Sequence, residues 1–436
     1  MIFIYTHKIT KRLQYIVELV FGELMGFDYK ITSNAEEFSR YDGAKISYSI
    51  SPIENALFLA AKNILFETDI RHQEFKTVDF GGNACPYAVF NSYSVMPFDI
   101  LAASFFLVTR YEEYLPHKKD HHKRFSASES CAFQNHFLHK PVVNKWAKEL
   151  KERILYTFPE LKTKTKQYSF TPTYDIDIAW SYKHKGFVRT SGGLIRDLWN
   201  NQLSLFRKRI LVLRGKDKDP YETYDLQKQL AKKYQLKPIY FFLFAELGPF
   251  DKSISPLNKH YQYLVKDIRD LATIGIHPSY ESNENPKLLK KEIQSLADAS
   301  HTEIVRSRQH FLKLTLPQTY RNLLNLGIQH DFTMGYADQL GFRAGICTPF
   351  NFYDLDMETD TRLRIHPFAI MDGTLRDYLK TDVENAKKLI SQIIREVKEV
   401  DGHFISLWHN ESLSDEGKWQ GWLDVYEHLL KEATSD

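Results

Sequence analysis

The segment Thr173-Tyr-Asp-Ile-Asp177 carries two carboxylates two residues apart, where a short apolar run ends. On an extended segment, side chains at this spacing point to the same side, so Asp175 and Asp177 would stand next to each other. Two adjacent negative charges repel unless a cation or an arginine compensates them. The pair therefore suits a metal ligand beside a general base, although an Asp-x-Asp pattern alone is common in loops.

Three further apolar runs end in side chains that bind metals or anions. These are His277, the group Arg306, Arg308 and His310, and the pair His409-Asn410. Glu281 follows His277 by four residues, and Pro278 between them is a good first residue of a helix. A histidine with a carboxylate at this spacing is workable for metal binding. If the runs are strands of one sheet, these side chains meet at one end of it.

The elements that must position these residues begin at Tyr168. From there, short apolar strands alternate with helices, which is the α/β pattern. The expected strands are Ser169 to Tyr174, Pro238 to Phe244, Ile274 to His277, Ile304 to Arg308, Asp331 to Met334, Arg364 to Ile370 and His403 to Trp408. Helices are expected at 288–299, 317–326, 384–400 and 420–432. We predict a distorted (β/α)7-type barrel over residues 168–436, with functional residues at the carboxyl ends of its strands.

Residues 1–163 predict a smaller, Rossmann-like α/β domain, followed by a polar, basic linker at 158–166. A strand is expected at 2–6, and helices at 11–25, 53–66, 98–115 and 141–156. The segment 116–130 contains His117, His121 and His122 among lysines, and we interpret it as a solvated loop.

An insertion at 183–218 has ten basic and two acidic side chains, a net charge of +8. It also contains an apolar set that includes Leu198, Trp199 and Leu213. A basic amphipathic helix of this kind either lies on an anionic membrane surface or packs on the protein with its basic face in water. Both interpretations stay open at this point.

The order of these motifs resembles the polysaccharide deacetylases of the NodB-like group, carbohydrate esterase family 4. Thr173, Asp175 and Asp177 match the first motif, and His277 matches the first histidine of the second, with Glu281 in place of the second histidine. Arg306 or Arg308 matches the third motif, and Leu407 with His409 matches the last. The resemblance covers residues 168–436. Residues 1–163 resemble the uncharacterised domain that precedes such deacetylases in some bacterial proteins, which implies no function.

The resemblance implies a divalent metal, expected to be Zn²⁺, on an Asp-His-His triad. Asp177 and His277 supply two ligands, and we favour His310 as the third, with Glu281 as the alternative and loss of the metal as a further one. Asp175 would be the general base, held by Arg308 or Arg306, and His409 the proton donor, oriented by Asp372. The implied reaction removes an N-acetyl group from an amino sugar or glycan, in envelope or capsule metabolism.

Composition constrains the class of protein more than the activity. Hydrophobic residues are 43% of the 436, and Lys and Arg (58) nearly balance Asp and Glu (55), so neither disorder nor nucleic-acid binding is indicated. The chain has three cysteines that lie far apart in the sequence, so a disulfide framework is not expected. The first residues lack the features of a signal peptide, and we expect a cytoplasmic protein. The rival hypotheses are a catalytically inactive glycan- or partner-binding module and a scaffold at the membrane surface.

Overall fold

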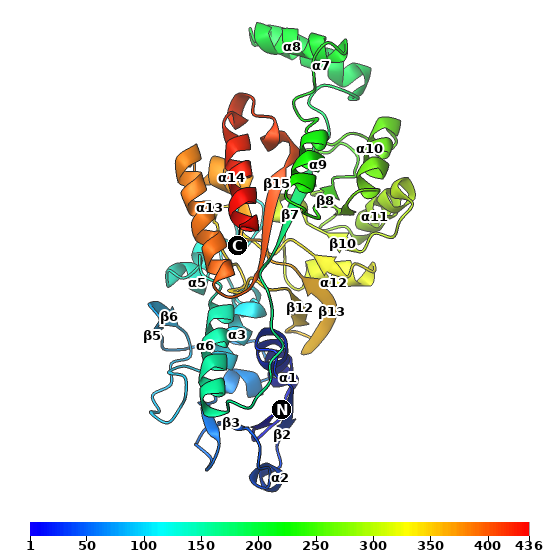
Figure 1. Ribbon diagram of the computed structural model, residues 1–436. Helices are drawn as coiled ribbons and strands as arrows, with labels where there is room; N and C mark the ends of the chain where they lie inside the picture. Colours follow the sequence, from blue (N-terminus) through cyan, green and yellow to red (C-terminus); the bar gives the residue numbers. More distant parts are fainter. Residues whose placement is uncertain (436) are drawn as a thin grey trace.

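The N-terminal part of the chain is built on a four-stranded parallel sheet. A computed structural model describes residues 1–435 (Figure 1). The strands are β1 (Ile2–Tyr5), β2 (Tyr29–Thr32), β3 (Lys45–Ser49) and β4 (Leu57–Ala60), in the order β2-β1-β3-β4. A small antiparallel hairpin, β5 (Val78–Phe80) and β6 (Asn83–Cys85), lies outside this sheet.

The helices of this part follow the predictions at 11–25 and 141–156. They are α1 (Lys11–Val17), continued by a π-helical stretch (Glu18–Leu24), α2 (Ala35–Ser39), α3 (Ile100–Val108), α4 (Tyr111–Tyr114), α5 (Cys131–Gln134) and α6 (Val142–Thr157). The single helix predicted over 98–115 is instead divided between α3 and α4, because Arg110 adopts a left-handed backbone conformation with φ of 54°. Asp99 caps α3 by accepting hydrogen bonds from the N–H groups of Leu101 and Ala102.

The prediction of a helix at 53–66 is wrong. This stretch forms β4 and a 3-10 turn (Asn63–Phe66). The run Leu57-Phe-Leu-Ala60 is apolar on both faces, and periodicity does not separate a short buried strand from a helix in such a run. Pairing with β3 decides the outcome.

The C-terminal part contains a nine-stranded sheet. Its strands are β7 (Ser169–Ile176), β8 (Ile239–Phe242), β9 (Thr273–Ile276), β10 (Arg306–Ser307), β11 (His330–Asp331), β12 (Phe350–Asp354), β13 (Thr359–Ile365), β14 (Ile370–Met371) and β15 (His403–His409). The order is β12-β13-β11-β10-β9-β8-β7-β15-β14, and every neighbouring pair is parallel except β12 with β13. The carboxyl ends of the parallel strands thus share one edge.

The strand predicted over 364–370 is divided in two. β13 pairs with β11, and β14 pairs with β15 at the other end of the sheet. The connecting residues stay hydrogen-bonded on both sides, since Phe368 N–H donates to Met334 at 3.1 Å and Ala369 N–H donates to Ile405 at 3.1 Å. One short segment therefore links the two ends of the parallel strand order.

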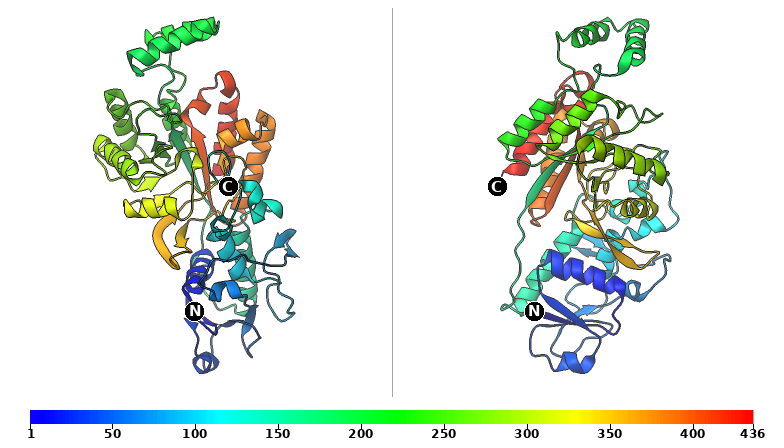
Figure 2. Two further views of the ribbon diagram at one scale, coloured as in Figure 1. Left: turned by 180° about the vertical axis from the view of Figure 1, so that it is seen from behind. Right: turned by 90° about the vertical axis from the view of Figure 1, so that its right-hand side faces the viewer.

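Helices lie around the outside of these strands (Figures 1 and 2). They are α9 (Tyr224–Lys233), α10 (Lys259–Arg269), α11 (Pro286–Ser300), α12 (Gln318–Asn325), α13 (Val383–Lys398) and α14 (Trp422–Thr434). The last four match the predicted helices within a few residues. No helix within residues 1–435 is long and apolar enough to cross a bilayer.

The insertion forms a hairpin of two helices, α7 (Gly186–Trp199) and α8 (Leu203–Leu213). Figures 1 and 2 show this hairpin projecting beyond the carboxyl end of β7; it contacts the rest of the C-terminal part where Arg189 Nη1 donates to the carbonyl oxygen of Ser253 at 2.8 Å and where Lys208 pairs with Glu416. The hairpin therefore contacts the C-terminal part through these side chains, and its position on a membrane surface stays a proposal. Asp197 of α7 is buried and accepts from Arg209 Nε of α8 at 2.7 Å, which joins the two helices.

The N-terminal and C-terminal parts share one hydrophobic core. Tyr15 of α1 and Phe105 of α3 pack on Tyr353 of β12, with ring centroids 4.9 and 5.4 Å apart. Buried charges cross the same boundary: Glu113 accepts from Arg343 Nη2 at 2.6 Å and from Arg110 Nε at 2.7 Å. Arg343 is fully buried in this contact.

Candidate metal and catalytic site

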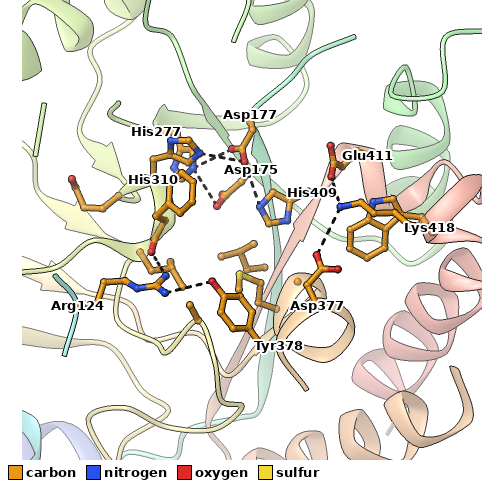
Figure 3. Close-up of a pocket in the computed structure, with 18 residues that line it drawn as sticks. Arg124, Asp175, Asp177, His277, His310, Asp377, Tyr378, His409, Glu411 and Lys418 are labelled. Atoms are coloured by element: carbon orange, nitrogen blue, oxygen red, sulfur yellow. Dashed lines mark hydrogen bonds and ion pairs between the residues drawn. The ribbon is translucent and has the colours of Figure 1, made fainter. Parts of the chain in front are cut away.

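The candidate site lies at the carboxyl ends of β7, β9, β10 and β15 (Figure 3). Asp175 is near the end of β7 and is 2% exposed, while Asp177 follows the strand and is half-buried. His277 directly follows β9, and His409 is the last residue of β15. His310 begins a short 3-10 turn after β10. Parallel pairing places these side chains around one cavity, as the sequence predicted.

Asp177, His277 and His310 form a group whose ligand atoms all lie within 4.8 Å of one another. Asp177 Oδ1 is 3.2 Å from His277 Nε2, and Asp177 Oδ2 is 3.5 Å from His310 Nε2. Glu281, the alternative third ligand, is exposed and is not part of this group among the described residues.

The hydrogen bonds behind the two histidines fit a metal. His277 Nδ1 is 2.5 Å from the carbonyl oxygen of Arg308, and His310 Nδ1 is 2.7 Å from Asp251 Oδ1. Both partners are acceptors, so each Nδ1 carries a proton, and Nε2 is the nitrogen of each ring that faces Asp177 and is available to a metal. Asp177 Oδ1 is buried without a hydrogen-bond partner within residues 1–435. Lone pairs that converge in this way are stabilised by a cation between them.

When no cation is bound, a proton between Asp177 and a histidine can stabilise the converging lone pairs instead. Burial alone would raise the pKa of the Asp177 carboxyl, but His310 and His277 hold this pKa well below its usual value. Burial alone would lower the pKa of His310, but Asp177 and Asp251 raise it to about 9. The site thus gathers positive charge around Asp177 in the absence of metal, and metal binding would compete with protons there.

Asp175 is paired with Arg308, a fully buried arginine. Arg308 Nη1 donates to Asp175 Oδ1 at 2.9 Å and to Thr173 Oγ1 at 2.7 Å, and its Nε donates to the carbonyl oxygen of Phe332 at 3.0 Å. This guanidinium compensates one of the two adjacent carboxylates. Of the two candidate arginines, Arg308 is therefore the one that contacts Asp175, while Arg306 lies two residues earlier in the chain.

The packing under Arg308 depends on a glycine in β9. Arg308 lies over the ring of Phe241, with its Cζ 4.6 Å from the ring centroid. A Cβ at Gly275 would stand 2.7 Å from that ring and 2.9 Å from the carbonyl oxygen of Arg306. Only glycine therefore lets Phe241 support the guanidinium in this position.

His409 is held by Asp372, which is fully buried. His409 Nδ1 is 2.8 Å from Asp372 Oδ1, and the His409 N–H donates to Asp372 Oδ2 at 2.8 Å. Burial alone would lower the pKa of His409, but Asp372, with Asp177 and Asp175, raises it well above its usual value. Nε2 of His409, 3.7 Å from Asp177 Oδ2, therefore carries a proton and faces the cavity.

The cavity has a volume of about 350 Å³. Its outer wall contains residues that the sequence did not single out, namely Arg124, Asp377, Tyr378, Glu411 and Lys418. Trp419 also lines it, although it is largely buried. Trp180 and Trp408, which lie close to Asp177 and His409 in the sequence, are buried and are not among the lining residues described.

The interpretation of 116–130 as a solvated loop is wrong. His122 and Arg124 are buried, and Arg124 lines the cavity. His122 packs on Phe311, with ring centroids 4.6 Å apart. The lysine-rich flanks hid this role, because a loop that folds over another part of the chain carries no periodic signal of burial.

A family of unknown function, DUF7033, matches residues 2–159, so the N-terminal part is indeed of an uncharacterised type. No curated protein matches the chain.

The solved structures that the chain resembles include several polysaccharide deacetylases. A protein classed as one from Mycobacterium smegmatis matches with a TM-score of 0.39 and 11% identity, covering 61% of this chain and 85% of that one. The polysaccharide deacetylase from Bacillus cereus matches with 0.29 and 11%, covering 61% and 87%, and Puue allantoinase with 0.38 and 9%, covering 62% and 84%. Likeness at this level assigns neither an activity nor a substrate to this chain.

Proposed function

We propose that the chain is a metal-dependent hydrolase that removes an N-acetyl group from an amino sugar or glycan, in envelope or capsule polysaccharide metabolism. The observation that carries the proposal is the convergence of Asp177, His277 and His310 within 4.8 Å, beside Asp175 and His409 in one cavity. Amide hydrolysis can use a metal ion together with a carboxylate as general base and a protonated imidazole as general acid, and this site places the residues for all three roles together.

The three ligands Asp177, His277 and His310 would hold the metal, with Zn²⁺ as the expected ion. When bound, this ion supplies a Lewis acid that polarises the substrate carbonyl and acidifies water. Asp251 and the Arg308 carbonyl orient the two histidines through their Nδ1 atoms. Two nitrogens and one carboxylate leave room in the coordination shell for water and substrate.

Asp175 and His409 would move the protons. Asp175 takes a proton from the attacking water as the new C–O bond forms, while Arg308 keeps the carboxylate in place. His409 gives its Nε2 proton to the sugar nitrogen as the C–N bond breaks, so that acetate and a free amine leave. The Asp175 proton then passes to solvent, and His409 is protonated again.

The rival function is a catalytically inactive module that binds a glycan or a partner. The glutamate at position 281 suggests this rival, because it replaces a histidine of the motif that the chain resembles. The position of His310 weakens the suggestion, since it offers the third ligand from the next strand end. A binding module also has no need of the buried Asp372 behind His409.

The finer description of the chain is also part of the proposal. We propose two domains. Residues 1–163 form a Rossmann-like domain built on the parallel sheet with the order β2-β1-β3-β4. Residues 168–436 form a distorted (β/α)7-type barrel, which the segment from β13 to β14 closes. We further propose that the protein acts in the cytoplasm.

The hairpin of α7 and α8 suggests a second partner, an anionic membrane surface. Phe187, Val188, Ile195 and Trp199 are exposed at helical spacing on α7, Phe187 and Trp199 each by 86%. Within 183–218 there are ten basic residues and two acidic ones, Asp197, which is buried, and Asp217, which is exposed. Such a surface repels a second copy of itself and attracts anionic lipid headgroups. We propose that it lies on the bilayer near the mouth of the cavity.

The enzymatic proposal is tested by measuring acetate release from N-acetylated mono-, oligo- and polysaccharides after purification without chelator and addition of zinc. We expect release by the wild-type chain that stops after chelation and returns with the metal. A chain that binds one zinc but releases no acetate from any of these classes contradicts the enzymatic proposal and leaves the binding module.

A further inference from the structure

We propose that Arg124, from the N-terminal part of the chain, is a positioning residue of the site, which holds the turn that presents His310. The N-terminal part is then a structural component of the active site. That His310 acts as a metal ligand rests on the proposed function; the clamp on its turn does not.

Arg124 is itself fixed before it reaches the turn. It is 6% exposed, and its Nε donates to Asp120 Oδ2 at 2.7 Å. Asp120 Oδ1 accepts from the backbone N–H groups of His122 and Arg124, both at 2.9 Å. Asp120 thus folds residues 120–124 into a tight loop and orients the guanidinium, so little freedom is lost when Arg124 makes a further contact.

The further contact is with the turn after β10. Arg124 Nη1 donates to the carbonyl oxygen of Phe311 at 2.7 Å, and its Nη2 is 3.4 Å from the hydroxyl of Tyr378 on the cavity wall (Figure 3). The ring of Phe311 lies between His122 and His310, 4.6 and 4.5 Å away. Two residues of one loop, His122 and Arg124, therefore bind both the ring and the backbone of Phe311.

The backbone that they bind is strained. Phe311 and Leu312 have φ of 58° and 55°, the left-handed region that residues with a Cβ avoid. Such conformations persist only where surrounding contacts impose them. His310 immediately precedes this pair, so relaxation of the turn would move its imidazole away from Asp177. Arg124 therefore supplies a charge-assisted hydrogen bond from the N-terminal part to the backbone of this turn.

A control must separate a specific effect on the turn from a general loss of stability between the two parts of the chain. Other arginines cross between the two parts of the chain: Arg364 pairs with Glu23, with Nη1 to Oε1 at 3.0 Å, away from the cavity. Arg364→Ala is therefore the matched control, since it removes a charge pair between the same two parts without touching the turn.

The first readout needs no metal. In hydrogen exchange of the metal-free full chain, we expect the peptide covering 308–313 to exchange at least threefold faster in Arg124→Ala than in wild type, with Arg124→Lys between them. Arg364→Ala should leave this peptide unchanged. Equal exchange of 308–313 in wild type and Arg124→Ala overturns the clamp, whatever the activity of the enzyme.

The second readout is zinc affinity, measured by competition with a chelating dye. Loss of an outer partner of a metal ligand typically costs about 10- to 100-fold in affinity, and we expect a loss in this range for Arg124→Ala. Arg124→Lys should recover part of it, because an ammonium can still donate to the Phe311 carbonyl. If Arg124→Ala does not fold, Arg124→Lys carries the test: affinity within twofold of wild type, with unchanged exchange at 308–313, contradicts the role. A wild-type chain that binds no zinc instead refutes the proposed metal and leaves the exchange result standing.

Discussion

Asp372 Oδ1 lies 2.8 Å from Nδ1 of His409, and the same carboxylate accepts the backbone N–H of His409 through Oδ2. The imidazole is thus fixed in orientation, and its Nε2 is left to face the cavity. The carboxylate stays ionised although it is buried: burial alone would raise the pKa of Asp372, but His409 and Ser412 lower it. This pair decides whether the site has a proton donor.

The first prediction concerns this pair. In Asp372→Asn the pKa of His409 should fall, because the largest favourable interaction of the imidazolium is removed. His409 would then lose its proton at lower pH, so the alkaline limb of the kcat profile should move to lower pH. We expect kcat to fall by about 10²-fold or more at neutral pH, with zinc content unchanged.

The control for this prediction is Ser412→Ala, which removes a smaller interaction with the same carboxylate. Its profile should shift less. An alkaline limb that stays in place in Asp372→Asn would show that His409 is not the group that titrates there.

The second prediction separates the two candidate third ligands. Asp177→Asn, His277→Gln and His310→Gln should each purify with far less than one zinc per chain, because each removes one of three ligands within 4.8 Å. Glu281→Gln should keep its zinc, since Glu281 is exposed outside this group. Elemental analysis of protein purified without chelator measures both. Retention of zinc by His310→Gln together with loss from Glu281→Gln would reverse the assignment.

The third prediction concerns the boundary between the two parts of the chain. Glu113→Gln leaves Arg343 and Arg110 buried without their shared carboxylate, which should cost about 3–5 kcal/mol in the free energy of unfolding. Denaturant unfolding measures this difference. Glu112, which also pairs with Arg110, is partly exposed, so Glu112→Gln should cost less.

The pH dependence of that difference has a definite sign. Burial would raise the pKa of Glu113, but Arg343 and Arg110 lower it from 4.5 to about 2. A group with a lowered folded-state pKa stabilises the fold above its unfolded-state pKa and loses this contribution as the pH falls toward the folded value. The gap between wild type and Glu113→Gln should therefore be full above about pH 4.5 and shrink toward pH 2. A gap that stays constant over this range would contradict the ionic assignment.

The fourth prediction concerns the hairpin of α7 and α8. The full chain should sediment with vesicles that contain anionic lipid at low salt, bind neutral vesicles weakly, and dissociate as salt screens the charge. Trp199→Ala should weaken the binding at all salt concentrations, because it removes an exposed aromatic anchor. As a control, Trp422→Phe alters a buried tryptophan of α14 and should bind as wild type does. No binding to anionic vesicles at low salt would refute the membrane partner.

The strand ends were readable from the sequence because their signal is local. An apolar run that stops at Asp, His or Arg marks both a buried strand and the edge at which it ends, and parallel pairing then brings separate edges together. This logic places Asp175, His277 and His409 around one cavity, and it places Arg308 beside Asp175. It also favoured His310 over Glu281, and these two side chains do lie inside and outside the ligand group, respectively.

The supporting residues could not be read in this way. Asp251, which orients His310, comes from a loop, and its neighbours in sequence show no periodic pattern. Arg124 reaches the site from 186 positions before His310, through a contact between the two parts of the chain. The misassigned helix at 53–66 has a related cause, since β4 exists because β3 pairs with it. Long-range contacts decide each of these cases, and local sequence does not encode them.

The most direct test of the account is acetate release by Asp175→Asn. Asn keeps the shape of the side chain but does not accept a proton from water, and the three metal ligands remain. We predict that this variant binds one zinc per chain as the wild type does, unfolds at a lower Tm because the buried Arg308 loses its charged partner, and releases acetate from the wild-type substrate about 10²- to 10⁴-fold more slowly when both are assayed well below that Tm. Release at the wild-type rate by a zinc-loaded Asp175→Asn chain would contradict the proposed chemistry.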